Sequence, residues 1–409
     1  MRRTIILFFV ALILVAIAAF FAFIFSPSSQ ENGDQSGNRG GGLGSLFPFN
    51  FGGNNNQNQG GGSGREPEGQ DNRPVPELRE VSNKPTSGGF LYTNADGVVM
   101  IRYIDRATGH VFETSTESLG SVRISNTTIP GIQEVLFSDQ NNFIIRYLTE
   151  NDEIENFYGR LTEEREEQTL RGDFVRSWER GVFDTSGENL LVVDEDPSGS
   201  TLLLSNPDGT NERQVFISSL RSWIPLQSDG GLYVQSAPSP NIPGSLFRIS
   251  NGELTKVVGG IEGMVAIVSP SGRYVLTSGG LGSQLVLHDT EQNETYSAVF
   301  SSVATKCVFV SEAPVQIVCG VPFEMGSGEY PNDWFIGRAQ FDDDIWLLEP
   351  VEGVASLLAV PSEDVGRIID VSNIAVDASG SYVSFINKTD LSFWTLKIAN
   401  QEEQEQIEE

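Results

Sequence analysis

The sequence predicts an all-β protein whose folded part is a β-propeller of about seven four-stranded antiparallel blades, preceded by one transmembrane helix and a disordered linker. Three observations lead to this prediction: an unbroken apolar run near the N-terminus, a stretch rich in Gly, Asn and Gln, and a turn pattern that then recurs at intervals of about 42 to 46 residues. They divide the 409 residues into a cytoplasmic start and transmembrane helix at 1–25, a linker at 26–88, the propeller at 89–398 and an acidic tail at 399–409.

The apolar run extends from Ile5 to Phe25. At 1.5 Å per residue, a helix of about 21 residues spans roughly 30 Å, the thickness of a bilayer core. Arg2 and Arg3 precede the run, so the positive-inside rule leaves the N-terminus in the cytoplasm and the rest of the chain outside it. A cleavable signal peptide has a shorter apolar core and a small-residue cleavage site, whereas this run ends at Ser26-Pro27. We therefore expect a retained single-pass anchor in the plasma (inner) membrane.

The linker consists mainly of Gly, Asn, Gln, Ser and Pro. Such a segment buries too little apolar surface to offset its conformational entropy, so it is expected to be disordered. It would let the following domain sample a volume above the membrane without a fixed orientation.

One turn pattern then recurs: an apolar residue, Ser, Asp or Asn, two small or polar residues, and Gly or Asn. The first of seven copies is Tyr92–Gly97, the sixth, Val310–Pro314, is degraded, and the last is Val376–Gly380. The first polar residue can bond back to the backbone, and Gly or Asn tolerates the positive φ that reverses the chain. A second hairpin signature such as Leu204–Gly209 follows most copies. Two hairpins per period make a four-stranded blade, which is typical of a propeller.

The best-preserved turn, Ser269-Pro270-Ser271-Gly272, followed by Leu285–Asp289, resembles the WD40-like repeats of TolB-type propellers. The N-terminal propeller of prolyl-oligopeptidase-type enzymes is similar. Together, anchor, linker and propeller also resemble bacterial surface proteins. The resemblance covers about 89–398 and implies the fold, but it leaves function open, because propellers have many unrelated activities.

The last interval between turn copies is longer, at 66 residues, and holds an insertion at Val321–Asp343. Long loops inside compact repeats are usually functional. Tyr and Trp, with Phe and Arg, are enriched at protein interfaces. The predicted binding residues are Tyr330, Asp333, Trp334, Phe335 and Arg338. The alternative is that the aromatic residues fill the propeller's own channel or close a blade edge.

The only two cysteines, Cys307 and Cys319, flank the degraded sixth turn. A tight hairpin there would place them opposite each other on paired strands, close enough for a disulfide after local adjustment. Oxidation is expected outside the cytoplasm. Two buried free thiols are the alternative.

The net charge of −29 argues against a nucleic-acid partner. The sequence has no nucleophile elbow or metal-ligand spacing, and its only histidines, His110 and His288, lie in different repeats. Asp342–Asp344 would be either part of a cation site or a solvated turn. We therefore predict no catalytic residues, metal or cofactor.

The function we expect is that of a membrane-anchored, extracytoplasmic module that binds another envelope protein or a surface ligand without catalysis. The alternative is a cell-envelope hydrolase or lyase whose carboxylates converge in the propeller channel, where sequence spacing does not reveal them.

Overall fold

The computed structural model describes residues 74–164 and 167–398. The predicted transmembrane segment Ile5–Phe25, most of the predicted linker and the acidic tail at 399–409 lie outside the described residues. Within the described ranges, no helix is long and apolar enough to cross a bilayer.

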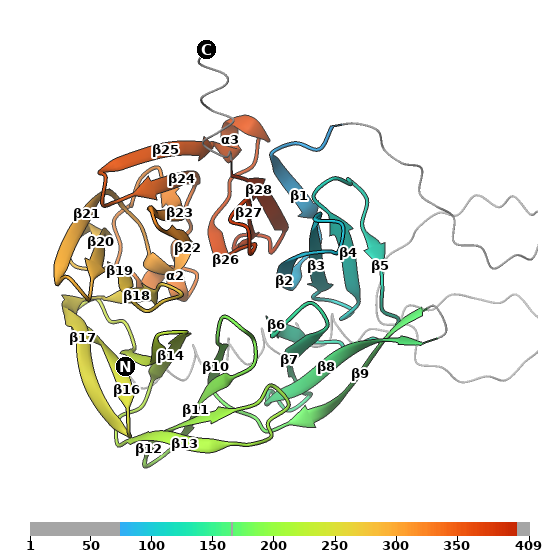
Figure 1. Ribbon diagram of the computed structural model, residues 1–409, viewed down its shortest axis with the longest axis horizontal. Coiled ribbons are helices and arrows are strands. Elements are labelled where there is room, and N and C mark those ends of the chain that lie inside the picture. The colour runs from blue at the N-terminus through green and yellow to red at the C-terminus, as the bar shows by residue number, and fades with distance from the viewer. Residues whose placement is uncertain (1–73, 165–166, 399–409) are drawn as a thin grey trace, which may run out of the picture. The chain divides into compact units, whose positions relative to one another are not determined.

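Seven antiparallel sheets of four strands each are arranged in a ring (Figure 1). The innermost strands are β2 (Thr86–Thr93), β6 (Ile132–Phe137), β10 (Arg180–Phe183), β14 (Trp223–Ser228), β18 (Val265–Val268), β22 (Cys307–Glu312) and β26 (Val371–Val376). The second strands are β3 (Val99–Asp105), β7 (Asn142–Leu148), β11 (Leu190–Asp196), β15 (Gly231–Ser236), β19 (Tyr274–Ser278), β23 (Val315–Pro322) and β27 (Tyr382–Asn387).

The third strands are β4 (Val111–Ser115), β8 (Ile154–Glu164), β12 (Gly199–Ser205), β16 (Pro243–Ser250), β20 (Gln284–Asp289), β24 (Asp343–Glu349) and β28 (Phe393–Lys397). The outermost strands are β5 (Val122–Arg123), β9 (Glu167–Val175), β13 (Arg213–Ser218), β17 (Glu253–Glu262), β21 (Glu294–Ser301), β25 (Val354–Ala359) and β1 (Leu78–Ser82). Four short helical segments occur in the described connections: η1 (Leu281–Ser283), η2 (Ala304–Lys306), α2 (Asn332–Phe335) and α3 (Pro361–Asp364). The prediction of a seven-bladed propeller with four-stranded antiparallel blades is confirmed.

The two ends of the described chain close the ring together. Strand β1 is the outermost strand of the seventh blade and pairs antiparallel with β28, with Leu78 opposite Leu396. The backbone N–H of Lys397 also donates to the carbonyl oxygen of Glu77, at 3.0 Å. The propeller therefore begins before residue 89: within the predicted linker at 26–88, residues 78–82 form β1 and residues 86–88 begin β2.

The recurring turn joins the innermost strand of each blade to the second strand. In the fifth blade, the backbone N–H of Tyr274 donates to the Ser269 hydroxyl at 3.1 Å, and that of Gly272 donates to the Ser269 carbonyl at 2.9 Å. Gly272 has a φ of 79°, and a Cβ there would lie 2.6 Å from the Tyr233 hydroxyl of the preceding blade. The turn residues thus reverse the chain and also let adjacent blades pack closely.

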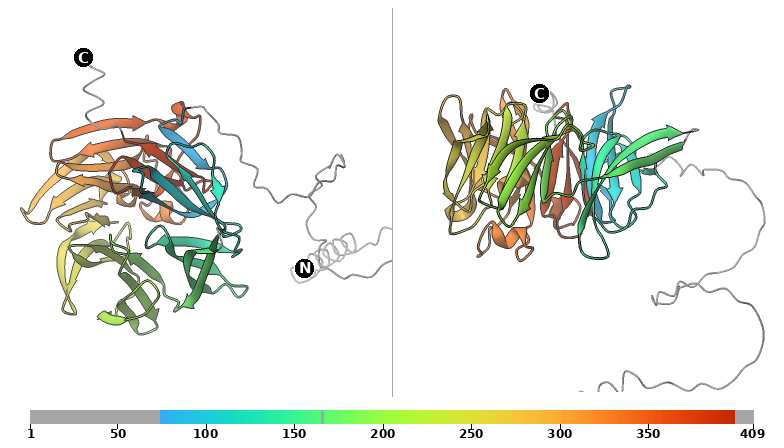
Figure 2. Two further views of the ribbon diagram at one scale, coloured as in Figure 1. Left: turned by 45° about the vertical axis from the view of Figure 1, so that its right-hand side comes forward. Right: turned by 90° about the horizontal axis from the view of Figure 1, so that it is seen from below.

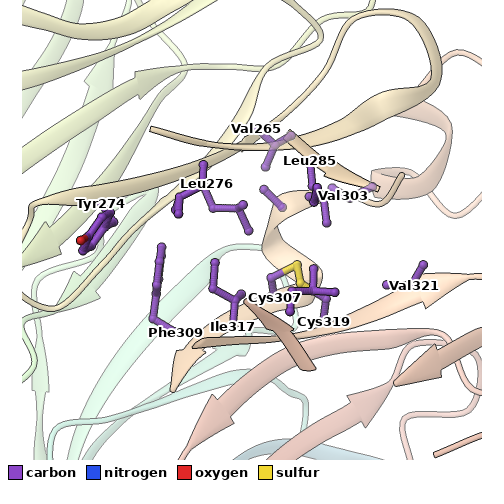
Figure 3. Close-up of a cluster of buried hydrophobic side chains, with 14 of the residues drawn as sticks. Val265, Tyr274, Leu276, Leu285, Val303, Cys307, Phe309, Ile317, Cys319 and Val321 are labelled. Carbon is purple, nitrogen blue, oxygen red and sulfur yellow. A yellow bond between two sulfur atoms is a disulfide. The ribbon is translucent and has the colours of Figure 1, made fainter. Parts of the chain in front are cut away.

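Apolar side chains fill the space between blades. The largest cluster lies around blades five and six and includes Leu276, Leu285 and Ile317 (Figure 3). Within it, Cys307 and Cys319 are directly opposite each other on β22 and β23 and form a disulfide, with their Cα atoms 4.1 Å apart. The predicted pairing across the sixth hairpin is therefore present in the structure.

Antiparallel blades give the ring two distinct faces. The turns between first and second strands lie on one face, and the connections between second and third strands and between blades lie on the other. The segment that contains α2 connects β23 to β24 and projects from the second face (Figure 2, right, orange). We call this side the α2 face. Strand β1 begins, and β28 ends, on the opposite face.

Candidate functional site

The insertion at 323–342 folds into a compact loop around α2 on the α2 face. The side-chain carboxylate of Asp333 accepts a hydrogen bond from the backbone N–H of Glu329 at 2.9 Å. The backbone carbonyl oxygen of Asp333 accepts hydrogen bonds from the backbone N–H groups of Arg338 and Ala339, at 2.8 and 2.9 Å. The rings of Tyr330 and Phe341 have their centroids 5.4 Å apart. The loop is therefore held by its own side chains and backbone, as in compact functional loops.

The five predicted binding residues occupy different environments. Trp334 is only 4% exposed, while Phe335 is 43% exposed and the Arg338 side chain is 73% exposed. Tyr330 is half-buried, and Asp333 forms a long ion pair with Arg338 at 3.6 Å. In this arrangement Trp334 fills the interior, as in the alternative interpretation of the insertion, and Phe335 and Arg338 face solvent. A binding role for these residues stays a prediction.

Trp334 contacts a buried ionic cluster. Its indole N–H donates to both carboxylate oxygens of Asp370, at 2.9 and 3.0 Å. The ammonium of Lys306 lies 2.6 Å from Asp370 and 2.6 Å from Asp343, and all three side chains are fully buried. We call these three residues the buried ionic cluster. The cluster joins blade six to blade seven. Blade six supplies Lys306 and Asp343, and Asp370 immediately precedes β26, the first strand of blade seven.

The environment of Asp343 raises its pKa to about 6, because burial disfavours the charged carboxylate more than the nearby Lys306 ammonium favours it. One oxygen accepts the backbone N–H of Val371 at 2.7 Å, and the other has no hydrogen-bond partner among the described residues. The interpretation of Asp342–Asp344 as a solvated turn is wrong for Asp343. This residue is the first of β24, and its side chain is buried in the protein.

Lys388, in the connection between β27 and β28, lies next to the same tryptophan. Its ammonium is 4.9 Å from the centre of the Trp334 ring and donates to the Trp334 carbonyl oxygen. Burial lowers the pKa of Lys388 and the positive charge of Lys306 adds to this, while the Asp370 carboxylate opposes both. An ammonium over an aromatic face is attracted by the ring's quadrupole. These contacts orient Trp334 and Lys388 relative to each other.

A pocket of about 380 Å³ lies beside Trp334 and Lys388. It involves the first residues of the innermost strands β2 and β26, with Gln133 from β6 and Thr305 just before β22, so it lies at the channel opening on the α2 face. We call it the channel-mouth pocket. Its lining residues are Thr86, Ser87, Arg106, Gln133, Thr305, Trp334, Phe335, Ser372, Asn373, Ile386, Lys388 and Leu391.

The channel-mouth pocket includes two of the predicted binding residues, Trp334 and Phe335, and residues from blades one, two, six and seven. Sequence reasoning missed Arg106, Lys388, Ser87 and Thr305. Arg106 lies in the second hairpin signature of the first repeat, whereas the other three carry no local signal.

The structure separates the pocket from the two carboxylates of the buried ionic cluster. Asp343 and Asp370 converge on Lys306, as an enzyme with a carboxylate pair would require, but both are fully buried and neither lines the pocket. His288 contacts the Thr277 hydroxyl at 2.9 Å in blade five, and His110 contacts the Thr128 hydroxyl at 3.2 Å in blade one. In the described part of the chain, no group of three or more His, Cys, Asp or Glu side chains is placed to hold a metal ion.

Neither a family model nor a curated protein matches the sequence. Among solved structures, the chain is similar to YCF48 bound to a D1 peptide, with a TM-score of 0.50 and 9% identity over 80% of this chain and 98% of that one. It is also similar to an oligogalacturonate lyase in complex with manganese (TM-score 0.48, 10% identity, 78% and 97% covered). A third is the β-propeller domain of the Trilobed protease from Pyrococcus furiosus (TM-score 0.46, 10% identity, 77% and 95% covered).

At these identities the similarity concerns the fold alone. By its seven four-stranded sheets, the chain is a seven-bladed β-propeller protein.

Proposed function

We propose that this chain is a membrane-anchored binding protein of the TolB-type, WD40-like kind, whose propeller lies outside the cytoplasm and captures a ligand or an envelope protein at the channel-mouth pocket. The observation that carries the proposal is the pocket itself, which four blades build around Trp334 and Phe335. Its volume of about 380 Å³ falls within the range of ligand sites, roughly 300–1,000 Å³.

The burial and ion pairing of Asp343 and Asp370 favour binding over hydrolysis or lyase chemistry. Asp343 and Asp370 are closed to solvent and engaged by Lys306, so a substrate in the pocket has no contact with them. The groups that line the pocket are aromatic, aliphatic, cationic, amide and hydroxyl groups, which recognise ligands without requiring a reaction.

The proposed position outside the cytoplasm rests on the apolar run Ile5–Phe25 and the preceding Arg2 and Arg3. A reporter enzyme that works only outside the cytoplasm, fused after Glu409, should be active. The mature protein should retain its first 25 residues, and their removal would contradict the anchor.

The binding proposal is tested by capture from a cell-envelope extract with the full chain in vesicles. We expect Phe335→Ala to reduce recovery of the captured ligand or protein, because this ring is the most exposed aromatic contact of the pocket. The matched control is Ile217→Ala, which removes a side chain that is 59% exposed on β13, away from the pocket. Equal recovery with both variants would contradict the proposed site.

A further inference from the structure

We infer that the channel-mouth pocket binds the carboxylate of a ligand that also carries an apolar or aromatic group. This inference rests on the proposed function, because it names the chemical class of ligand for the same site.

Two cationic side chains line the pocket, and no carboxylate does. The guanidinium of Arg106 donates to the Gln133 side-chain oxygen at 2.5 Å and to the Gln133 carbonyl oxygen at 3.3 Å, which orients it. Lys388 is oriented by the ring and carbonyl oxygen of Trp334. Both cations are therefore held at the pocket by neutral groups.

The chain is acidic, with 55 Asp and Glu residues and 26 Lys and Arg residues. Elsewhere in the described part of the chain, Arg102, Arg146 and Arg273 each form an ion pair with a carboxylate, whereas Arg79 and Arg248 donate to neutral oxygens. Arg106 and Lys388 form no such ion pair within the described residues, and the carboxylate near Lys388, Asp370, is engaged by Lys306 and Trp334. An anionic ligand would supply the missing counter-charge.

Two hydroxyl groups of the pocket residues also have no partner. The hydroxyl oxygens of Ser87 and Thr305 are buried and make no hydrogen bond among the described residues, and Ser87 is only 3% exposed. Both hydroxyls are closed to solvent, so Arg106 and Lys388 are the pocket groups that a ligand's carboxylate would meet. A carboxylate has four lone-pair sites and accepts bonds from ammonium and guanidinium groups together.

The other lining residues of the pocket indicate which group of the ligand lies next to its carboxylate. Trp334, Phe335, Ile386 and Leu391 give the pocket an apolar side that suits a hydrocarbon or aromatic group. The net charge of −29 repels polyanions, so a compact single charge fits better than a phosphorylated or polyacidic ligand. The shared chemistry is a carboxylate next to an apolar side chain, either in a free acid or at the C-terminus of a peptide.

The test uses N-acetylphenylalanine and its primary amide, titrated calorimetrically against the full chain. A second arm uses a hexapeptide ending in phenylalanine, with a free or an amidated C-terminus. We expect the acid to bind about ten- to a hundredfold more tightly than the amide in at least one arm, as for a hydrogen-bonded charge. The arm with the higher affinity identifies the source of the carboxylate.

Arg106→Gln and Lys388→Gln should each weaken binding of the acid about tenfold or more and leave binding of the amide nearly unchanged. The control is Lys256→Gln, at an exposed position on β17 outside the pocket, which should change neither. Melting curves of each variant establish that the propeller is folded, and the acid-to-amide ratio within one variant is independent of its stability.

Equal affinity for acid and amide, with both lost in Phe335→Ala, would overturn the carboxylate inference and leave the proposed binding site standing. The same holds if neither probe binds while capture from the envelope extract still depends on Phe335. If no probe binds and capture is also independent of Phe335, both the inference and the proposed site fail.

Discussion

The ammonium of Lys306 lies 2.6 Å from a carboxylate oxygen of Asp370, which is 64 positions further along the chain, and neither side chain is exposed to solvent. Together with Asp343, this pair connects blade six to blade seven, and Asp370 accepts the indole N–H of Trp334, which lines the channel-mouth pocket. The cluster therefore positions Trp334 as well as joining two blades.

Lys306→Met should destabilise the propeller by about 3–5 kcal/mol, because it leaves two buried carboxylates without their cation. Denaturant unfolding followed by tryptophan fluorescence measures the change. Lys256→Met is the matched control at an exposed lysine and should change stability by less than about 0.5 kcal/mol. A similar small effect in both variants would show that the cluster contributes little.

Asp343→Asn should change how stability depends on pH. The pKa of Asp343 is about 6 in the folded protein and near 3.8 when unperturbed, so between these values the folded state binds a proton that the unfolded chain has released. Stability contributed by this group is therefore highest below about pH 4 and falls as the pH rises towards 6. The asparagine amide is always neutral and can still accept the Val371 N–H.

Melting temperatures measured from pH 4 to pH 7 check this prediction. The stability of Asp343→Asn relative to the native sequence should rise from pH 4 to about pH 6 and then level off. Asp96→Asn, at an exposed turn position, is the control. A constant difference across the range would contradict the raised pKa.

Trp334→Ala should destabilise the propeller by about 3–5 kcal/mol, because it leaves a cavity and removes a hydrogen-bond donor from Asp370. Phe335→Ala, at the neighbouring and partly exposed position, should change stability by less than about 1 kcal/mol. Melting and capture are measured on both variants. If Trp334→Ala is as stable as the native protein but captures less, the main role of Trp334 is in ligand binding and its predicted role in stability is wrong.

Removing β1 should open the seventh blade. A fragment that starts at residue 83 keeps β2 intact but exposes the edge of β28, whereas a fragment that starts at residue 74 retains the closing strand. An unpaired edge invites aggregation, so the shorter fragment should melt at a lower temperature and elute as larger species in size-exclusion chromatography. Identical behaviour of the two fragments would show that β1 is dispensable.

The disulfide should make a modest contribution to stability. Cys307 and Cys319 are 12 positions apart, and the loop they close is short, so loss of the bond should cost less than roughly 3 kcal/mol. Peptide mapping by mass spectrometry without reductant should recover the two cysteines in one linked fragment. Recovery of two free thiols would reject the bond.

The blades could be predicted from the sequence because most blades repeat the same local requirement. A polar residue that bonds back to the turn and a residue with positive φ recur in most blades where the first strand meets the second, as at Ser269 and Gly272. Strand β1 was not predicted because it precedes the first recurring turn, and its partner, β28, lies near the other end of the sequence.

The pocket was only partly predictable. Trp334 and Phe335 were found because the insertion interrupts the repeat. Arg106 and Lys388 were missed because they line one pocket only when the ring closes, and a repeat pattern does not show which polar residues face the channel. Asp343 looked like part of an acidic turn, since only the folded structure brings Lys306 beside it.

Pairing β1 with β28 has a consequence for the order of folding. Strand β1 is synthesised first among the blades' strands, but its partner follows more than 300 residues later, so this contact is the most non-local in the ring. Such contacts form slowly, because a long loop must be ordered before they are made. Blades one to six can assemble as the chain emerges, while the seventh must wait for Phe393–Lys397. Synthesis that stops before this point would leave an open ring with β1 unpaired, a species marked by an exposed strand edge.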